Sequence, residues 1–220
     1  MRPLIVASLP IKKIEDLKLI GNFLDADLIE LRLDYLKDRE VSVISDYFEF
    51  LDKYRNKLII TLRDKAEGGI NELADELKIS LLKELYDKQF LYDVEVSFIQ
   101  KHNVPYDNAI VSIHYFNYLP TSEKVKEIVS KFYEKAFSVK IAVLGLKGYK
   151  EVILPLLEYE NVTVIPMSNN PLERIAVGLL GSKLVYSYAI EPLAQGQLYY
   201  KKVIQIFDYI NNIITSSSVT

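Results

Sequence analysis

Short apolar runs rich in β-branched residues alternate along this chain with longer segments whose apolar residues recur at helical spacing. Such runs are typical of buried parallel strands, and the segments between them are typical of amphipathic helices that cover a sheet. The pattern predicts eight strands, at Leu4–Leu9, Leu28–Asp34, Leu58–Arg63, Tyr92–Val96, Ala109–His114, Ser138–Val143, Val162–Met167 and Leu184–Ile190.

A helix is predicted after each strand, and the signals differ in strength. The third is the clearest, because leucines recur at every fourth position from Leu73 to Leu85. The fourth is short and weak. The eight predicted helical segments are Lys12–Phe23, Val41–Lys53, Ile70–Lys88, Ser97–His102, Thr121–Lys135, Lys147–Glu158, Pro171–Leu180 and Gly196–Asn212.

Eight consecutive strand–helix units without a linker or a low-complexity tract favour one (β/α)8 barrel, a TIM barrel, in a single domain over residues 1–215. A doubly wound parallel sheet is the alternative that the same alternation leaves open. Residues 216–220 follow the last predicted helix and are rich in serine, so we expect a frayed C-terminal tail there.

The composition narrows the class of partner. The formal net charge is -3, and acidic and basic residues are interspersed, so no basic surface for nucleic acid is indicated. The chain has no cysteine, which excludes disulfides and thiolate metal sites. No apolar run approaches the roughly twenty residues that a membrane helix needs. We therefore expect a cytoplasmic protein that acts on a small molecule, without nucleic acid or membrane as a partner.

Polar residues fall on one face of several predicted strands. Side chains alternate across a strand, and in a β/α protein the helices cover the outer face, so polar residues of equal parity are expected to point inward. Active sites of such barrels lie at the C-terminal ends of the strands. The residues of the polar face are Glu30, Arg32 and Asp34; Thr61 and Arg63; Asp93 and Glu95; Ser112 and His114; and Ser138 and Lys140.

Each of these residues, taken alone, also has a structural explanation. Lys140 could extend past its strand to solvent, and His114 could be a hydrogen-bonded structural histidine. The structural explanation accounts poorly for their joint occurrence at strand ends. Ion pairs, surface positions or loop and cap roles could likewise explain Glu30 with Arg32, Arg63 with Glu67, Arg174, Gln197 and Ser168.

Six segments in order along the chain resemble the type I 3-dehydroquinate dehydratase family. The most specific is a Thr-x-Arg-x-x-x-Glu-Gly-Gly stretch that is followed by a strand histidine and a strand lysine. The segments are Glu30–Asp34, Thr61–Gly69, Ser112–His114, Val139–Ala142, Met167–Ser168 with Arg174, and Ala194–Gln197. The resemblance implies a (β/α)8 barrel that dehydrates 3-dehydroquinate to 3-dehydroshikimate in the shikimate pathway of aromatic amino acid biosynthesis, with no metal and no organic cofactor.

The resemblance also implies the catalytic roles. Lys140 is similar to the lysine that forms an imine, a Schiff base, with the ketone of the substrate. Burial and nearby arginines should favour its neutral amine, which is the nucleophile. His114 resembles the residue that removes a proton and returns it to the departing hydroxyl, and Glu67 resembles the carboxylate that orients this histidine. Gly68 and Gly69 are expected to let the loop turn tightly behind this pair.

Binding roles follow from the same resemblance. Arg174 resembles the arginine that holds the substrate carboxylate, for which a planar guanidinium is suited. Gln197 resembles a residue of a lid loop, and Ser168 matches an auxiliary position. The residues that resemble those contacting ring hydroxyls and organising the site are Glu30, Arg32 and Arg63.

Three positions depart from the family pattern. Tyr115 stands where an aspartate is common, and Leu193 and Gln195 replace a serine and a proline of the lid motif. These changes put details of substrate binding and lid closure in doubt, but not the reaction. Two other functions are left open by the residues: a different imine-forming barrel enzyme such as a class I aldolase, and a catalytically inactive barrel. A homodimer is expected from the family alone.

Overall fold

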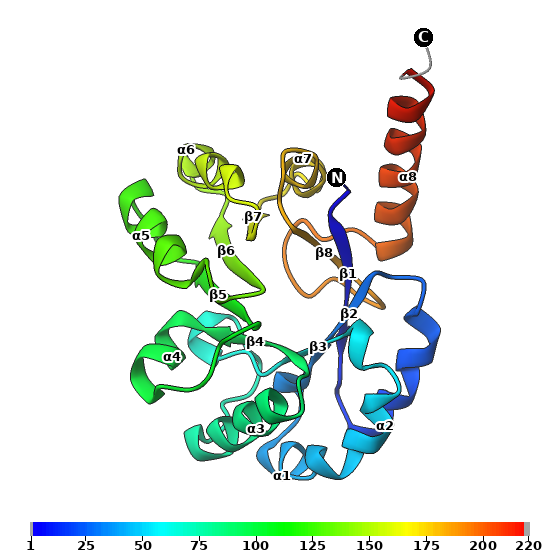
Figure 1. The fold of residues 1–220 in the computed structure, drawn as a ribbon, viewed down its shortest axis with the longest axis vertical. Helices are drawn as coiled ribbons and strands as arrows, with labels where there is room; N and C mark the ends of the chain where they lie inside the picture. The colour runs from blue at the N-terminus through cyan, green and yellow to red at the C-terminus, as the bar shows by residue number, and fades with distance from the viewer. Residues whose placement is uncertain (1, 218–220) are drawn as a thin grey trace.

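A computed structural model describes residues 2–217 and contains a ring of parallel strands with helices outside it (Figure 1). Each strand is a short apolar run that is hydrogen-bonded to its neighbours in parallel register. The strands are β1 Leu4–Pro10, β2 Leu28–Arg32, β3 Leu58–Thr61, β4 Leu91–Glu95, β5 Ile110–Tyr115, β6 Ser138–Leu144, β7 Val162–Met167 and β8 Leu184–Tyr188.

The order of the strands confirms the predicted barrel. The sheet runs β7-β6-β5-β4-β3-β2-β1-β8, so strands that follow each other in sequence pair, and β8 returns to pair with β1. The backbone amide of Lys183, just before β8, donates to the carbonyl of Val162 in β7 at 2.9 Å. This hydrogen bond brings the two ends of the sheet together. A doubly wound sheet, which reverses its strand order, is therefore the wrong alternative.

The helices between the strands are less regular than the pattern predicted. The α-helices are α1 Asp38–Val41, α2 Phe48–Asp52, α3 Asp75–Asp87, α4 Val96–His102, α5 Ser122–Phe132, α6 Tyr149–Ile153, α7 Leu172–Leu179 and α8 Tyr200–Ser217. The 3₁₀ helices are η1 Ile14–Phe23, η2 Leu33–Tyr35, η3 Ile44–Tyr47, η4 Arg55–Lys57, η5 Lys65–Glu67 and η6 Leu154–Glu158.

The prediction of one helix over Val41–Lys53 is wrong. The segment is divided among the end of α1, η3 and α2. The stretch from Ser42 to Asp46 holds two serines, two β-branched residues and an aspartate, which all favour the helix interior less than leucine or alanine do. The first predicted helix is likewise a 3₁₀ helix, η1, and not an α-helix.

Two apolar layers follow from the alternation of side chains along the strands. Inward side chains fill the barrel, for example Val6, Ile59 and Tyr186, and outward side chains pack against the helices. The polar residues of the inward parity lie buried in the upper barrel, so the predicted inward orientation of that face is confirmed for Lys140 and Asp93. The barrel interior thus carries an apolar floor under a charged upper level.

The C-terminal helix begins and ends later than the predicted Gly196–Asn212. Helix α8 continues to Ser217, so residues 216 and 217, which we expected in a frayed tail, are helical. The rest of that predicted tail, residues 218–220, lies outside the described part of the chain. None of the helices within residues 2–217 combines the length and the apolar character that a membrane crossing requires.

Candidate active site

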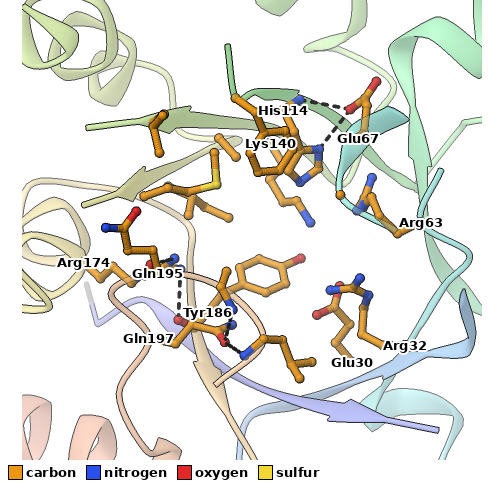
Figure 2. A pocket seen from close by; sticks show the side chains of 18 residues that line it. Glu30, Arg32, Arg63, Glu67, His114, Lys140, Arg174, Tyr186, Gln195 and Gln197 are labelled. Atoms are coloured by element: carbon orange, nitrogen blue, oxygen red, sulfur yellow. Dashed lines mark hydrogen bonds and ion pairs between the residues drawn. The ribbon is translucent and has the colours of Figure 1, made fainter. Parts of the chain in front are cut away.

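A cavity of about 220 Å³ opens at the C-terminal ends of the strands (Figure 2). Every residue predicted for the site except Ser168 lines this cavity. The charged and polar side chains come from β2, the loop after β3, β5, β6, α7, β8 and the loop after β8. The apolar ones include Phe116, Leu144 and Met167. The strands therefore bring together residues that are up to 167 positions apart, Glu30 and Gln197, in one pocket.

Lys140 lies in the middle of β6 with its side chain inside the barrel, 2 % exposed. Its Nζ donates to Oδ2 of Asp93 at 2.6 Å and lies 4.4 Å from the ring centroid of Tyr186. Burial lowers the pKa of Lys140 below its usual value; Asp93 opposes the shift and the positive charge of Arg63 adds to it. The free amine, which is the nucleophilic form, is therefore a larger fraction of Lys140 than of a surface lysine at the same pH.

His114, near the end of β5, faces Glu67 from the loop after β3. Oε2 of Glu67 lies 2.9 Å from Nδ1 of His114 and accepts from the backbone amide of His114 at 3.0 Å. Burial, with Arg63 and Lys140 nearby, holds the pKa of His114 well below its usual value, and burial raises the pKa of Glu67 to about 7. The imidazole is therefore neutral near pH 7, and its second nitrogen, Nε2, is free to take a proton.

The turn behind this pair requires glycine, as predicted. Gly68 has φ = +87°, in the left-handed region, and a Cβ there would meet the ring of Phe116 at 2.7 Å. A Cβ on Gly69 would lie 2.1 Å from the carbonyl oxygen of Arg63. The two glycines let the loop approach the strand ends closely enough for Glu67 to reach His114.

Buried charges of alternating sign lead from the pocket to the outside of the barrel. Arg63 contacts Asp93 and Glu95, each at 2.8 Å, and Lys78 of α3 donates to the other oxygen of Glu95 at 2.7 Å. With the Lys140–Asp93 pair, this forms a chain of five charged groups. An ion pair between Arg63 and Glu67, the structural alternative for these residues, is therefore wrong, because Arg63 is committed to the inner carboxylates.

Glu30 and Arg32 line the pocket but do not pair with each other. Glu30 accepts from Ser8 at 2.6 Å and from Thr61 at 3.0 Å, while Arg32 binds both oxygens of Asp34, at 2.7 and 2.8 Å. The suggested Glu30–Arg32 ion pair is wrong, because Arg32 sits at the end of β2 and the following turn, η2, brings Asp34 against it. A carboxylate can accept about four hydrogen bonds, so Glu30, which accepts two, can still accept from a ligand.

Arg174, on α7, is buried without a carboxylate partner in the described part of the chain. Its Nη2 donates to the carbonyl of Gln195 at 2.7 Å and its Nη1 to the carbonyl of Tyr186 at 3.4 Å, but its Nε has no partner among the described residues. Burial lowers the pKa of Arg174 to about 10. A buried guanidinium with unused donors at a pocket wall is suited to an anionic ligand.

The loop after β8 forms one wall of the cavity. Oε1 of Gln197 accepts from the backbone amides of Leu193 and Ala194, at 2.7 and 3.1 Å, so this side chain folds the loop and lines the pocket at the same time. Ser168, predicted as an auxiliary residue, does not line the cavity. It directly follows Met167, which does, and its hydroxyl donates to Glu173.

Three residues of the site were not assigned from the sequence. Asp93 had the inward parity, but its pairing with Lys140 depends on the register of β4, β5 and β6. Lys78 looked like an ordinary residue of an amphipathic helix, and no local signal marks it as buried. Tyr186 could have been found by applying the same parity rule to β8, where it shares the inner face with Leu184.

No group of three or more His, Cys, Asp or Glu side chains within residues 2–217 is arranged to hold a metal ion. The carboxylates in and around the pocket are instead paired with arginine, lysine, histidine or hydroxyl groups.

Fold and site together define a class: a (β/α)8-barrel protein whose pocket joins a buried lysine, a histidine–carboxylate pair and a buried arginine suited to an anion. The sequence model of the type I 3-dehydroquinase family matches residues 5–152. The chain is 84 % identical to the 3-dehydroquinate dehydratase of Saccharolobus solfataricus over the full length of both chains. It is 44 % identical to that of Sulfolobus acidocaldarius, over 98 % of this chain and 97 % of the relative.

Solved structures agree on the fold. A type I 3-dehydroquinate dehydratase from Clostridium difficile superposes with a TM-score of 0.76 at 24 % identity, over 96 % of this chain and 93 % of that one. The 3-dehydroquinate dehydratase from Aquifex aeolicus gives a TM-score of 0.71 at 24 % identity, over 92 % and 96 %. The chain belongs to the type I 3-dehydroquinase family, and the predicted resemblance is confirmed.

Proposed function

We propose that this protein is a lyase that removes water from 3-dehydroquinate to give 3-dehydroshikimate, through an imine between the substrate ketone and Lys140. One observation carries the proposal: the buried amine of Lys140 and the neutral imidazole of His114 share a cavity with Arg174, which pairs with no carboxylate within residues 2–217. Family membership and the 84 % identical relative support the same reaction.

In the proposed reaction Lys140 is first the nucleophile and then, as the imine, the electron acceptor. Its free amine attacks the ketone carbon, and uptake of one proton with loss of one water gives the protonated imine, which withdraws electrons from the neighbouring carbon; the final hydrolysis releases that proton again. His114 removes a proton from that carbon, the electrons form the new double bond, and the hydroxyl on the next carbon leaves with the proton that His114 returns. Hydrolysis of the imine consumes one water and frees Lys140, so the net change is the loss of one water.

The environment of the two groups supports these roles. Asp93, 2.6 Å from the Lys140 nitrogen, would stabilise the positive imine that forms there. Glu67 holds Nδ1 of His114 and so turns Nε2 toward the pocket, and it would stabilise the imidazolium after proton removal. Both functions depend on side chains that are already in position before substrate arrives.

Substrate binding would divide between the two sides of the cavity. Arg174 would hold the carboxylate through its unused donors, and Glu30 and Arg32 would contact the ring hydroxyls. Arg63 would act mainly as an organiser, because its guanidinium already contacts Asp93 and Glu95. Gln197 would complete the pocket as part of a closing lid, with Ser168 in an auxiliary role.

The departures in the lid bear on binding. Leu193 lines the cavity with an apolar side chain where the family pattern has a serine hydroxyl. The carbonyl of Gln195 accepts from Arg174 at 2.7 Å and so ties the loop to the proposed carboxylate site. A backbone contact of this loop or another lid residue would have to replace the missing hydroxyl.

Further expectations follow from the sequence and stay predictions: a cytoplasmic location, a homodimer, a catalytic domain within residues 1–215, and catalysis without metal or organic cofactor. A role in aromatic amino acid biosynthesis would follow from the reaction, since the product belongs to the shikimate pathway.

The test is to add 3-dehydroquinate and follow the ultraviolet absorbance of the conjugated product. The wild-type protein should produce it and Lys140→Met should not. Lys183→Met is the matched control, because Lys183 is a half-buried lysine that also has a lowered pKa but lies before β8, away from the cavity. It should keep its activity. A wild-type protein that gives no product would contradict the proposal and favour a catalytically inactive barrel.

A further inference from the structure

Tyr186 places in the cavity a hydroxyl to which no described side chain or backbone group is hydrogen-bonded. Its ring belongs to the inner face of β8, lines the cavity and is 4 % exposed. The hydroxyl oxygen is buried and has no hydrogen-bond partner among the described residues. Buried hydroxyls usually have partners, so an unpaired one at a cavity wall indicates a partner that comes from outside the protein.

The position of this hydroxyl is defined by its neighbours. The Lys140 nitrogen lies 4.4 Å from the centroid of the Tyr186 ring, and the Tyr186 carbonyl accepts from Arg174 at 3.4 Å. Figure 2 shows the ring crossing the pocket, with its hydroxyl directed away from Arg174, toward the side that holds Glu30 and Arg32. The hydroxyl therefore lies between the proposed imine lysine and the proposed site for the ring hydroxyls.

The hydroxyl is a donor under working conditions. Burial, together with the negative charges of Glu30 and Asp93, holds the pKa of Tyr186 well above its usual value. A phenol that stays protonated can donate its hydrogen to a neutral oxygen of a ligand. It is not a proton-transfer group near pH 7, which restricts it to binding and orientation.

Two proposed contacts of the substrate determine which of its oxygens lies next to the Tyr186 hydroxyl. If Arg174 holds the carboxylate and Lys140 the ketone carbon, the substrate ring continues from the ketone toward Glu30. The first oxygen on that side is the hydroxyl on the carbon next to the ketone. We infer that the Tyr186 hydroxyl donates a hydrogen bond to this oxygen, which makes Tyr186 a specificity-determining residue. The inference rests on the proposed function and names a contact beyond it.

The test compares Tyr186→Phe with the wild type on two compounds: 3-dehydroquinate, and its analogue in which hydrogen replaces the hydroxyl next to the ketone. Tyr186→Phe should lower kcat/KM for 3-dehydroquinate by about tenfold, equivalent to about 1.4 kcal/mol. For the analogue, kcat/KM of the two proteins should agree within about twofold, because the analogue lacks the oxygen to which the Tyr186 hydroxyl would donate. If the analogue is not turned over, its inhibition constants are compared in the same way.

Tyr115→Phe is the matched control. Tyr115 also has a buried hydroxyl without a partner, but its ring packs outside the barrel, in the layer beneath the helices, and does not line the cavity. Tyr115→Phe should change kcat/KM by no more than about twofold for either compound. Both variants remove one unpaired hydroxyl and keep the ring, so the melting temperature should not fall in either.

The outcomes separate the two proposals. A wild-type protein that leaves 3-dehydroquinate unchanged would contradict the proposed function and, with it, this contact. Active wild-type protein with an unaffected Tyr186→Phe variant would overturn the contact alone. An equal loss on substrate and analogue would also overturn it, since the hydroxyl would then act on the protein or on another part of the ligand.

Discussion

Removing the charge of Asp93 should change the ionisation of Lys140 in a predictable direction. Oδ2 of Asp93 lies 2.6 Å from the Lys140 nitrogen and is the strongest influence that keeps this amine protonated against the effect of burial. Asparagine at this position keeps the size and one oxygen acceptor but loses the charge. Arg63, which contacts Asp93 at 2.8 Å, would then repel the ammonium with less compensation, since Glu30 is the remaining carboxylate that favours it.

The size of the shift follows from the distance. An opposite charge within hydrogen-bonding range raises the pKa of an amine by about 1–3 units, so Asp93→Asn should lower the pKa of Lys140 by about that amount. Each unit corresponds to about 1.4 kcal/mol and makes the free amine about ten times more abundant at pH values below the pKa.

The assay needs no substrate. Acetic anhydride, a small acylating reagent, labels free amines, and mass spectrometry of the peptide that contains Lys140 gives the pH midpoint of its reaction. The midpoint should fall in Asp93→Asn and should not move in Asp75→Asn, which removes the partner of the exposed Lys101 instead. An unchanged or raised midpoint in Asp93→Asn would refute the assigned electrostatics of the site.

Three further predictions follow from the same site. His114→Ala should still form the imine. Its kcat, measured by product absorbance, should fall by about 10²–10⁴-fold, the usual contribution of a positioned acid–base group. Loss of the imine would contradict the assigned role. Arg174→Lys should raise KM about 10- to 100-fold with a smaller change in kcat, because an ammonium lacks the planar pair of donors; an unchanged KM would exclude Arg174 as the carboxylate site. Lys140→Met should alter the pH dependence of stability: burial lowers the pKa of Lys140 in the folded state below 10.5, so wild-type protein loses this proton before the unfolded chain does. Its free energy of unfolding should therefore rise relative to the variant as pH approaches 10.5, in urea titrations at several pH values, and parallel curves would disprove the lowered pKa.

The strands and their inner faces could be predicted because they depend on a local pattern. A buried parallel strand needs a continuous apolar run, and the two-residue alternation fixes which side chains share a face. Lys140 and Asp93 were therefore assigned to the correct parity. The Gly68 turn was also predictable, since a glycine pair after Glu67 indicates a backbone that other residues adopt with strain.

Pairing across strands could not be predicted, because it depends on register and on turns. The sequence suggested Glu30 as a partner for Arg32, whereas the turn after β2 delivers Asp34. The ion pair of Lys140 with Asp93 crosses from β6 to β4, past β5, and no local pattern specifies it. The division of the predicted helix near Ser42 also depends on packing, because weak helix formers take whatever geometry the barrel surface allows.

The central claim is the imine on Lys140, and trapping it is the most direct test. The protein is incubated with 3-dehydroquinate, the mixture is reduced with borohydride, and the modified peptide is mapped by mass spectrometry. The account predicts a single adduct on Lys140, which is absent in Lys140→Met and present in His114→Ala. Product formation without any adduct on Lys140, or an adduct on another lysine, would contradict it.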